Sequence, residues 1–186
     1  MKRYKKVDFP VDQARRYLEP GPIVLVSSLW KGRTNIMTLG WQTVMEFTPS
    51  LVGCIIASSN HSFEMIRRSR QCVINIPTID LAHEVVKIGN TDGDKIDKFT
   101  KFHLTPTPAT KVKAPLIAEC PASFECRLTD GRLINRYNFF IFEIVKAHVA
   151  RSPKYLKTMH YHGKGVFTIA GKTINLNRQF TKWRDV

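Results

Sequence analysis

Alternating and continuous apolar runs divide the chain into short β-strands. Residues Pro22 to Trp30 (PIVLVSSLW) are mostly apolar or β-branched, and a turn signal at residues 31–33 separates them from a second extended run, Thr34 to Trp41. Two such runs joined by a short glycine turn predict a β-hairpin. The run Leu51 to Ala57 (LVGCIIA) is apolar at nearly every position, which predicts a strand buried on both faces.

In two places the apolar spacing changes to that of a helix. Residues 59–68 place apolar side chains on one helical face and charged ones on the other, with Ser59 or Asn60 as the N-cap. Residues 80–87 (DLAHEVVK) follow the same pattern, with Asp80 as the expected N-cap. We therefore expect two short helices within a β-rich chain.

The second half of the chain begins with a polar, proline-rich stretch and then returns to strands. Residues 89–115 carry glycine, aspartate and several prolines, and we expect irregular structure there. Strands are predicted at 118–128 and 137–149, the latter (YNFFIFEIVKAHV) apolar enough to be central, and a short extended piece at 165–169. Many strands with two short helices predict a mainly β fold, a closed or nearly closed barrel rather than a doubly wound sheet.

Length and composition fit one soluble domain. We expect a single unit over 1–186, with its core at about 20–150 and a C-terminal extension at 151–186. No apolar run approaches the roughly 20 residues of a membrane span, and no signal-peptide pattern follows the first residues. The expected location is therefore the cytoplasm, without a membrane partner.

The four cysteines are Cys54, Cys72, Cys120 and Cys126, and no two of them form a Cys-x-x-Cys pair. Reduced, buried thiols fit this pattern best, and we expect no metal site. A disulfide between Cys120 and Cys126 stays open at this stage.

The formal net charge of +14 favours an anionic ligand, an acidic protein partner or nucleic acid. Basic residues concentrate only at Lys2 to Lys6, Arg67 to Arg70 and Arg178 to Arg184. No recognition helix, zinc finger or ribonucleoprotein aromatic motif accompanies them, so nucleic-acid binding is not the expected function.

Two segments carry candidate binding residues. At the junction of the strand ending near Ala57 and the following helix, backbone N–H groups and serine hydroxyls could hold a phosphate, although ordinary helix capping explains the same residues. In residues 35–41, Gly40 would let a flat ring approach the backbone, Trp41 and Met37 offer apolar faces, and Thr38 could hydrogen-bond the ring. Core packing of a hairpin is the alternative for this segment.

The ordered set of motifs resembles a known family. Asn-x-Met-Thr-x-x-Trp at 35–41, a Thr-Pro strand start, Ser-Ser-Asn-His-Ser-Phe-Glu at 58–64 and Cys-Val-Ile-Asn-Ile-Pro at 72–77 resemble the flavin-reductase-like FMN-binding proteins. Later elements, Asp-Lys-Phe at 97–99 and Glu-Cys-Pro at 119–121 among them, resemble the flavoredoxin branch. The resemblance implies a six-stranded Greek-key split β-barrel that forms a homodimer and binds FMN near the subunit boundary.

The same resemblance suggests which residues bind the cofactor. One group would border the isoalloxazine ring: Asn35, Met37, Thr38, Leu39, Gly40 and Trp41. A second group would hold the phosphate and ribityl chain: Ser58, Ser59, Asn60, His61, Ser62 and Phe63. Lys98 would add positive charge, with a solvated lysine as the alternative.

The expected activity is that of a redox protein whose chemistry is carried by FMN. It would transfer electrons between NAD(P)H or a small acidic redox protein and an acceptor, or else supply reduced FMN to a separate oxygenase. Short flavin reductases carry a histidine before the long central strand, where this chain has Asn138, and this departure weighs against direct NAD(P)H oxidation. The remote alternative is a basic nucleic-acid-binding barrel.

Overall fold

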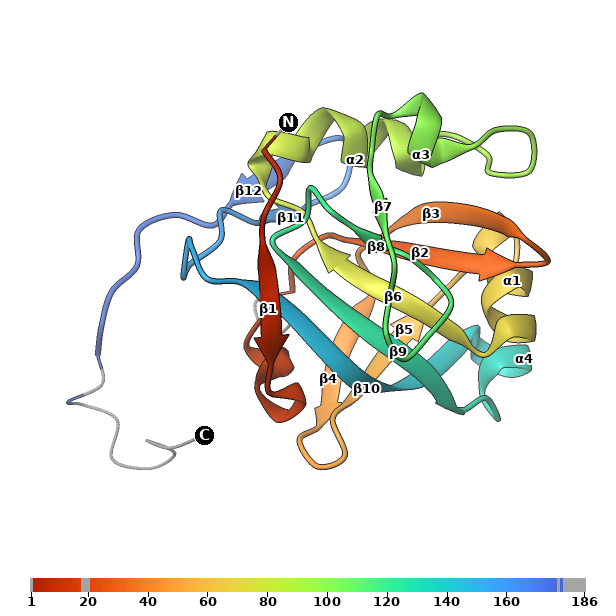
Figure 1. Ribbon diagram of the computed structural model, residues 1–186, viewed down its shortest axis with the longest axis horizontal. Helices are drawn as coiled ribbons and strands as arrows, with labels where there is room; N and C mark the ends of the chain where they lie inside the picture. The colour runs from red at the N-terminus through yellow and green to blue at the C-terminus, as the bar shows by residue number, and fades with distance from the viewer. Residues whose placement is uncertain (1, 18–20, 177, 179–186) are drawn as a thin grey trace.

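A computed structural model describes residues 2–17, 21–176 and 178 (Figure 1). Its main sheet has eight strands, in the order β3-β2-β6-β9-β10-β5-β4, with β1 also paired to β10. The strands are β1 (Lys6–Phe9), β2 (Val24–Trp30), β3 (Arg33–Leu39), β4 (Gln42–Glu46), β5 (Leu51–Ile55), β6 (Gln71–Ile76), β9 (Ala122–Asp130) and β10 (Phe139–Ala150). Two small two-stranded sheets join β7 (Pro106–Thr107) to β8 (Leu116–Ile117) and β11 (Met159–Tyr161) to β12 (Phe167–Ile169).

Strand β10 is central, as its apolar sequence predicts. One of its edges pairs with β9, and the other pairs with β5 along its first half and with β1 along its second half. Its alternate side chains Phe140 and Phe142 are fully buried, and their rings stack with centroids 5.8 Å apart. Phe63 of the first helix meets Phe140 edge to face at 5.3 Å, so the helix is fastened to the same core.

The β2–β3 hairpin is buried on both faces because two cores flank it. Val24 and Val26 point into the barrel interior, whereas Leu25 between them points into a second cluster that includes Val85 and Phe99. Since successive strand residues face opposite sides, this alternation requires a covering layer outside the sheet. Helices α2 (Ala82–Gly89) and α3 (Lys98–Lys101) supply it and lie over β3 at the top of Figure 1.

Several expected boundaries change in the structure. The first helix, α1 (His61–Ser69), is capped by Asn60, one of the two expected residues. Asp80 is not an N-cap: it lies within a 3-10 turn, η2 (Ile79–Leu81), that precedes α2, and its carboxylate interacts with the Thr78 hydroxyl. The stretch expected to be irregular contains α3, because the Asp97 carboxylate accepts from the backbone N–H groups of Phe99 and Thr100 and starts a turn.

The sheet also exceeds the six strands that the resemblance implied. Strand β1 comes from the basic N-terminal segment and was not expected; it follows the second half of β10. Tyr137 belongs to a short helix, α4 (Ile134–Tyr137), so β10 begins two residues later than predicted. At the end of β5, Ile55 and Ala57 are exposed, so burial on both faces holds for Val52 to Cys54 rather than for the whole run.

The remaining expectations concern cysteines, membranes and the C-terminal segment. All four cysteines are buried free thiols, so the Cys120–Cys126 disulfide is not formed. Within the described residues, no helix has both the length and the apolar character to cross a membrane. Of the basic run 178–184, every residue but Arg178 lies outside the described part of the chain.

Candidate functional site

A pocket lies where β3, the start of α1 and the segment after α2 meet. It is lined by six of the residues predicted from sequence: Asn35, Met37, Thr38, Asn60, His61 and Lys98. Strand β3 contributes the first three, the N-terminus of α1 the next two, and α3 the lysine. The fold therefore brings together three segments that are separated by more than twenty residues in the chain.

Asn35 links two of these segments and has an unused acceptor. Its side-chain nitrogen donates to the Ser62 hydroxyl at 2.9 Å, which ties β3 to α1. Its amide oxygen is buried and has no hydrogen-bond partner among the described residues. A buried carbonyl without a donor is costly, so this atom marks a place where a ligand N–H group would be stabilising.

Lys98 is a buried cation at the same pocket. Only 3% of the residue is exposed, and its ammonium donates to the Ile88 carbonyl at 3.0 Å. Burial lowers the pKa of Lys98 to about 8, while the nearby Asp92 carboxylate acts in the opposite direction. The solvated-lysine alternative is therefore wrong: at neutral pH this side chain holds a positive charge inside the fold.

The N-terminus of α1 faces the pocket, and one of its backbone N–H groups already has a hydrogen-bond partner within the chain. The Asn60 side chain accepts from the Ser62 N–H at 2.9 Å, so ordinary helix capping does occur here. Ser58 and Ser59 precede the cap on an exposed turn. The positive end of the helix dipole and these hydroxyls remain available to an anion.

Thr38 and Met37 form the β3 wall of the pocket. The Thr38 hydroxyl donates to the Val85 carbonyl at 2.7 Å, so its proton is committed to α2 while its oxygen can still accept. Met37 is 2% exposed and also belongs to the barrel core. The core-packing alternative thus holds for part of this segment.

The other predicted residues do not line the pocket. Leu39, Ser62 and Phe63 are buried, whereas Gly40, Trp41, Ser58 and Ser59 are exposed and lie outside the pocket lining. Trp41 is 72% exposed at the start of β4. Any contact between these residues and a cofactor remains a prediction.

The segment from Ile88 to Gly93 completes the pocket and was not predicted from sequence. Gly93 is buried against the Asn35 side chain, and a Cβ at this position would clash with the Asn35 amide group. The available signal was the pair Asp92-Gly93 after an amphipathic helix, but only the packing of α2 on β3 places it beside Asn35.

Asn138, which stands where short flavin reductases have a histidine, adopts a left-handed conformation (φ 56°) as the C-cap of α4. Its carbonyl accepts from the Ile56 N–H at 3.0 Å. Asparagine tolerates this conformation well, so the residue has a structural role in ending α4 before β10.

The sequence profile described as flavin reductase like domain matches residues 15–170. This chain belongs to the flavin reductase-like family. An uncharacterised protein of Archaeoglobus fulgidus is 34% identical over 113 residues, which make up 61% of this chain and 64% of that protein. The family resemblance seen in the motifs is thus confirmed.

Solved structures of two other proteins share the fold. An FMN-binding domain of a flavin reductases-like enzyme from Shewanella baltica matches with a TM-score of 0.86 and 22% identity, covering 94% of this chain and 99% of that chain. Flavoredoxin of Desulfovibrio vulgaris (Miyazaki F) matches with a TM-score of 0.76 and 22% identity, covering 83% and 89%. The mainly β, split-barrel prediction is confirmed.

The polar groups of the pocket suit one end of a flavin mononucleotide rather than the whole molecule, because the pocket has a volume of only about 60 Å³. The unpaired Asn35 oxygen can accept from a ring N–H group, and the Lys98 ammonium and the start of α1 suit a molecule with a negatively charged phosphate. The site therefore combines a buried acceptor, a buried cation and the N-terminus of a helix.

Proposed function

We propose that this protein binds FMN in the pocket between β3, α1 and α3 and transfers electrons between NAD(P)H or a small acidic redox protein and an acceptor. The observation that carries the proposal is the meeting of an unpaired buried acceptor, Asn35 Oδ1, with a buried cation, Lys98, at one pocket of a flavin reductase-like fold. The bound cofactor would supply the redox-active ring.

The chain's own residues would bind and orient the cofactor. Asn35 would accept a hydrogen bond from it, and the Thr38 oxygen would remain available as a second acceptor because its proton is directed to Val85. Lys98 would stabilise negative charge on the cofactor, more strongly in this buried position than at the surface. The serines before α1 would add donors for the phosphate.

The first test is the visible absorption spectrum of the purified, desalted protein with and without added FMN. Flavin bands that stay with the protein support the proposal, and Lys98→Met should weaken FMN binding about tenfold or more. The matched control is Lys101→Met, since Lys101 lies on the same helix but is exposed. A protein that takes up no FMN would overturn the proposal.

The electron donor is tested in the same cuvette by anaerobic addition of NADH and then NADPH. Slow or absent bleaching is expected, because Asn138 stands in place of the family histidine and serves the backbone around α4. A small acidic redox protein would then be the donor. Rapid bleaching with turnover of free FMN would instead identify a flavin reductase that supplies an oxygenase.

We also propose that the protein is a homodimer formed through the outer face of β4, β5 and the start of β10. Ile55 pairs with Phe139, and Gly53 with Ile141, so these side chains share a face. Trp41 (72% exposed) and Met45 (43% exposed) extend it. Contiguous exposed apolar side chains on a sheet edge are typical of a protein interface.

The dimer is tested by sedimentation or light scattering at several concentrations. Trp41→Glu should shift the protein towards the monomer, whereas Tyr155→Glu, at a 62% exposed aromatic outside this face, should not. A wild-type protein that sediments as a monomer would contradict the proposal.

The four unpaired thiols support a reducing, cytoplasmic setting for the protein.

A further inference from the structure

A second cavity lies away from the pocket between β3, α1 and α3, which we call the flavin pocket, and shares no lining residue with it. It has a volume of about 520 Å³ and lies between the end of α1, the start of β6, the segment 110–113 and residues 127–128 of β9. Four of its nine lining residues are cationic, namely Arg70, Lys111, Lys113 and Arg127, and no carboxylate lines it among the described residues. We call it the basic groove.

The basic groove is assembled by the fold. Its four cations come from three parts of the chain that are more than ten residues apart, and only Arg70 belongs to a basic run in the sequence. All four side chains are exposed, and cations gathered around one hollow attract an anion more strongly than cations dispersed over the surface.

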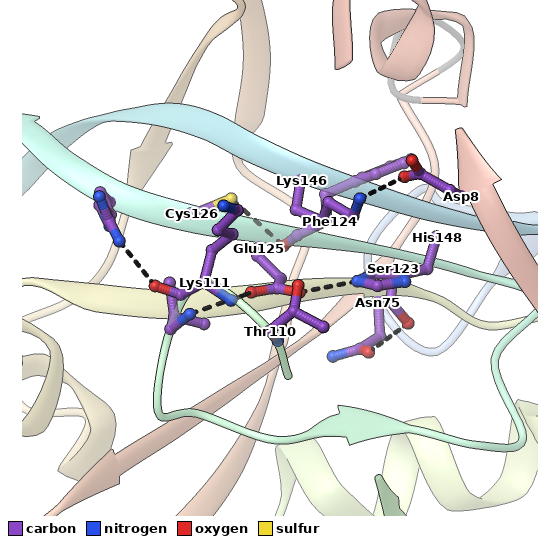
Figure 2. Close-up of polar contacts among 12 residues, drawn as sticks. Asp8, Asn75, Thr110, Lys111, Ser123, Phe124, Glu125, Cys126, Lys146 and His148 are labelled. Carbon is purple, nitrogen blue, oxygen red and sulfur yellow. Dashed lines mark hydrogen bonds and ion pairs between the residues drawn. The ribbon is translucent and has the colours of Figure 1, made fainter. Parts of the chain in front are cut away.

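The wall formed by residues 110–113 is held in place by a buried carboxylate. Glu125 is fully buried and accepts from the Thr110 N–H and hydroxyl, both at 2.9 Å, from the Val112 N–H at 3.0 Å and from the Lys111 N–H. Figure 2 shows the carboxylate between this segment and His148, whose Nε2 lies 2.7 Å from it.

Those hydrogen bonds also keep Glu125 charged. Burial raises the pKa of Glu125, but hydrogen bonds from His148 and from Thr110 and Lys111 more than compensate and hold it below its ordinary value. Because Lys111 donates to Glu125 through its backbone N–H, its side chain is left free to face the groove. The loop is thus preorganised at neutral pH.

Three further hydrogen bonds position the remaining cations. The side-chain carbonyl of Gln71 accepts from the Lys113 N–H at 2.7 Å, which fixes the far end of the wall. Arg127 donates to the Lys111 carbonyl at 2.8 Å, and Arg70 donates to the Leu128 carbonyl at 3.0 Å. Each guanidinium has several N–H donors beyond the one used, in the forked geometry that suits phosphate oxygens.

We infer that the basic groove binds a phosphate-bearing small molecule of about nucleotide size. Its volume falls within the roughly 300–1,000 Å³ of small-molecule sites. Guanidinium and ammonium groups around one hollow favour a compact polyanion over a neutral ligand. The volume of the groove matches a small molecule, whereas an acidic protein would need a much broader contact surface. The inference is independent of FMN binding.

Isothermal titration calorimetry with ADP at fixed ionic strength tests it, on protein first saturated with FMN and then without FMN. Saturation keeps the phosphate groups of ADP out of the flavin pocket, and the same result is expected in both states. The decisive variant is Lys111→Ala/Lys113→Ala, because both side chains are exposed and the backbone N–H groups that bind Glu125 and Gln71 are kept. It should bind ADP about tenfold more weakly or worse.

The matched control is Lys154→Ala/Lys172→Ala, which removes the same charge from exposed positions outside the groove and should change the affinity by less than about twofold. Arg127→Lys keeps the positive charge but removes the forked guanidinium group, and it should also weaken ADP binding. Equal weakening in both double variants, no measurable ADP binding, or equally tight binding of poly-L-glutamate through the groove would each overturn the inference.

Discussion

Replacing Glu125 by glutamine tests how the segment 110–113 is held against the sheet. The glutamine keeps the shape of the side chain but has a single carbonyl oxygen, whereas the Glu125 carboxylate has two, each accepting at least two hydrogen bonds. If the new NH₂ group replaces Oε2, it faces the N–H groups of Lys111 and Val112. If the NH₂ group instead replaces Oε1, the Thr110 hydroxyl and the His148 ring nitrogen can accept hydrogen bonds from it instead of donating. Only the Thr110 N–H then loses its partner.

The second arrangement is the cheaper one and sets the expected magnitude. An unpaired buried N–H group costs about 1–3 kcal/mol, and the bonds that remain are weaker without the charge, which brings the total to about 2–4 kcal/mol. The assay is urea unfolding followed by tryptophan fluorescence at equal protein concentration. Glu84→Gln, at a partly exposed carboxylate of α2, is the control and should change stability by less than about 0.5 kcal/mol.

The difference in free energy of unfolding between wild type and Glu125→Gln should depend on pH. The folded-state pKa of Glu125 is held below the ordinary 4.5 by hydrogen bonds that outweigh burial. The stability this contributes is fully present above pH 4.5 and is lost as the pH falls through the folded-state pKa. Wild type and Glu125→Gln should therefore differ at pH 7 and converge in acid. A difference below about 0.5 kcal/mol at pH 7 would refute the reasoning.

Four further predictions concern other buried groups. Lys98→Met should raise the free energy of unfolding of the FMN-free protein at pH 7. The difference in free energy of unfolding between the variant and wild type should narrow as the pH rises from about 8 towards 10.5, because wild type then no longer holds a proton on a buried amine. Urea unfolding across this pH range measures the difference, and a difference that stays constant would contradict the prediction. For wild type with FMN, binding should weaken as the pH rises past 8, which fluorescence titration measures. All four cysteines should resist a thiol reagent in native protein and react in urea, since each is buried; fast native labelling would be inconsistent with the structure. Phe140→Ala should lower the free energy of unfolding by about 3–5 kcal/mol, against little change for Tyr155→Ala.

Local sequence patterns predicted the correct secondary-structure element where residues adjacent in the chain decide the conformation. The glycine turn between β2 and β3 and the apolar sequence of β10 led to correct elements. The predictions failed where distant residues decide. Asp80 is a reasonable cap by type, but η2 occupies that position. Strand β1 carries a weak signal of its own and exists because the second half of β10 offers it an edge.

The same division holds for the candidate site. Motifs at 35–38 and 60–61 and the single residue Lys98 pointed to the pocket, since their residue types suit a flavin. That Lys98 is buried with an unpaired Asn35 oxygen at the same pocket follows only from the packing of α2 and α3 on β3. Periodicity and motif spacing report on adjacent residues, whereas burial and convergence depend on contacts across the chain.

By itself, the sequence determined the family, the β-rich class and three of the segments that meet at the pocket, because these depend on residue type and short-range spacing. Only the tertiary structure decided which of those residues line the pocket, that Glu125 holds the segment 110–113, and that four scattered cations form one groove. The reason is physical: a carboxylate or a lysine acquires its role from the groups that surround it after folding, and those groups come from distant parts of the chain.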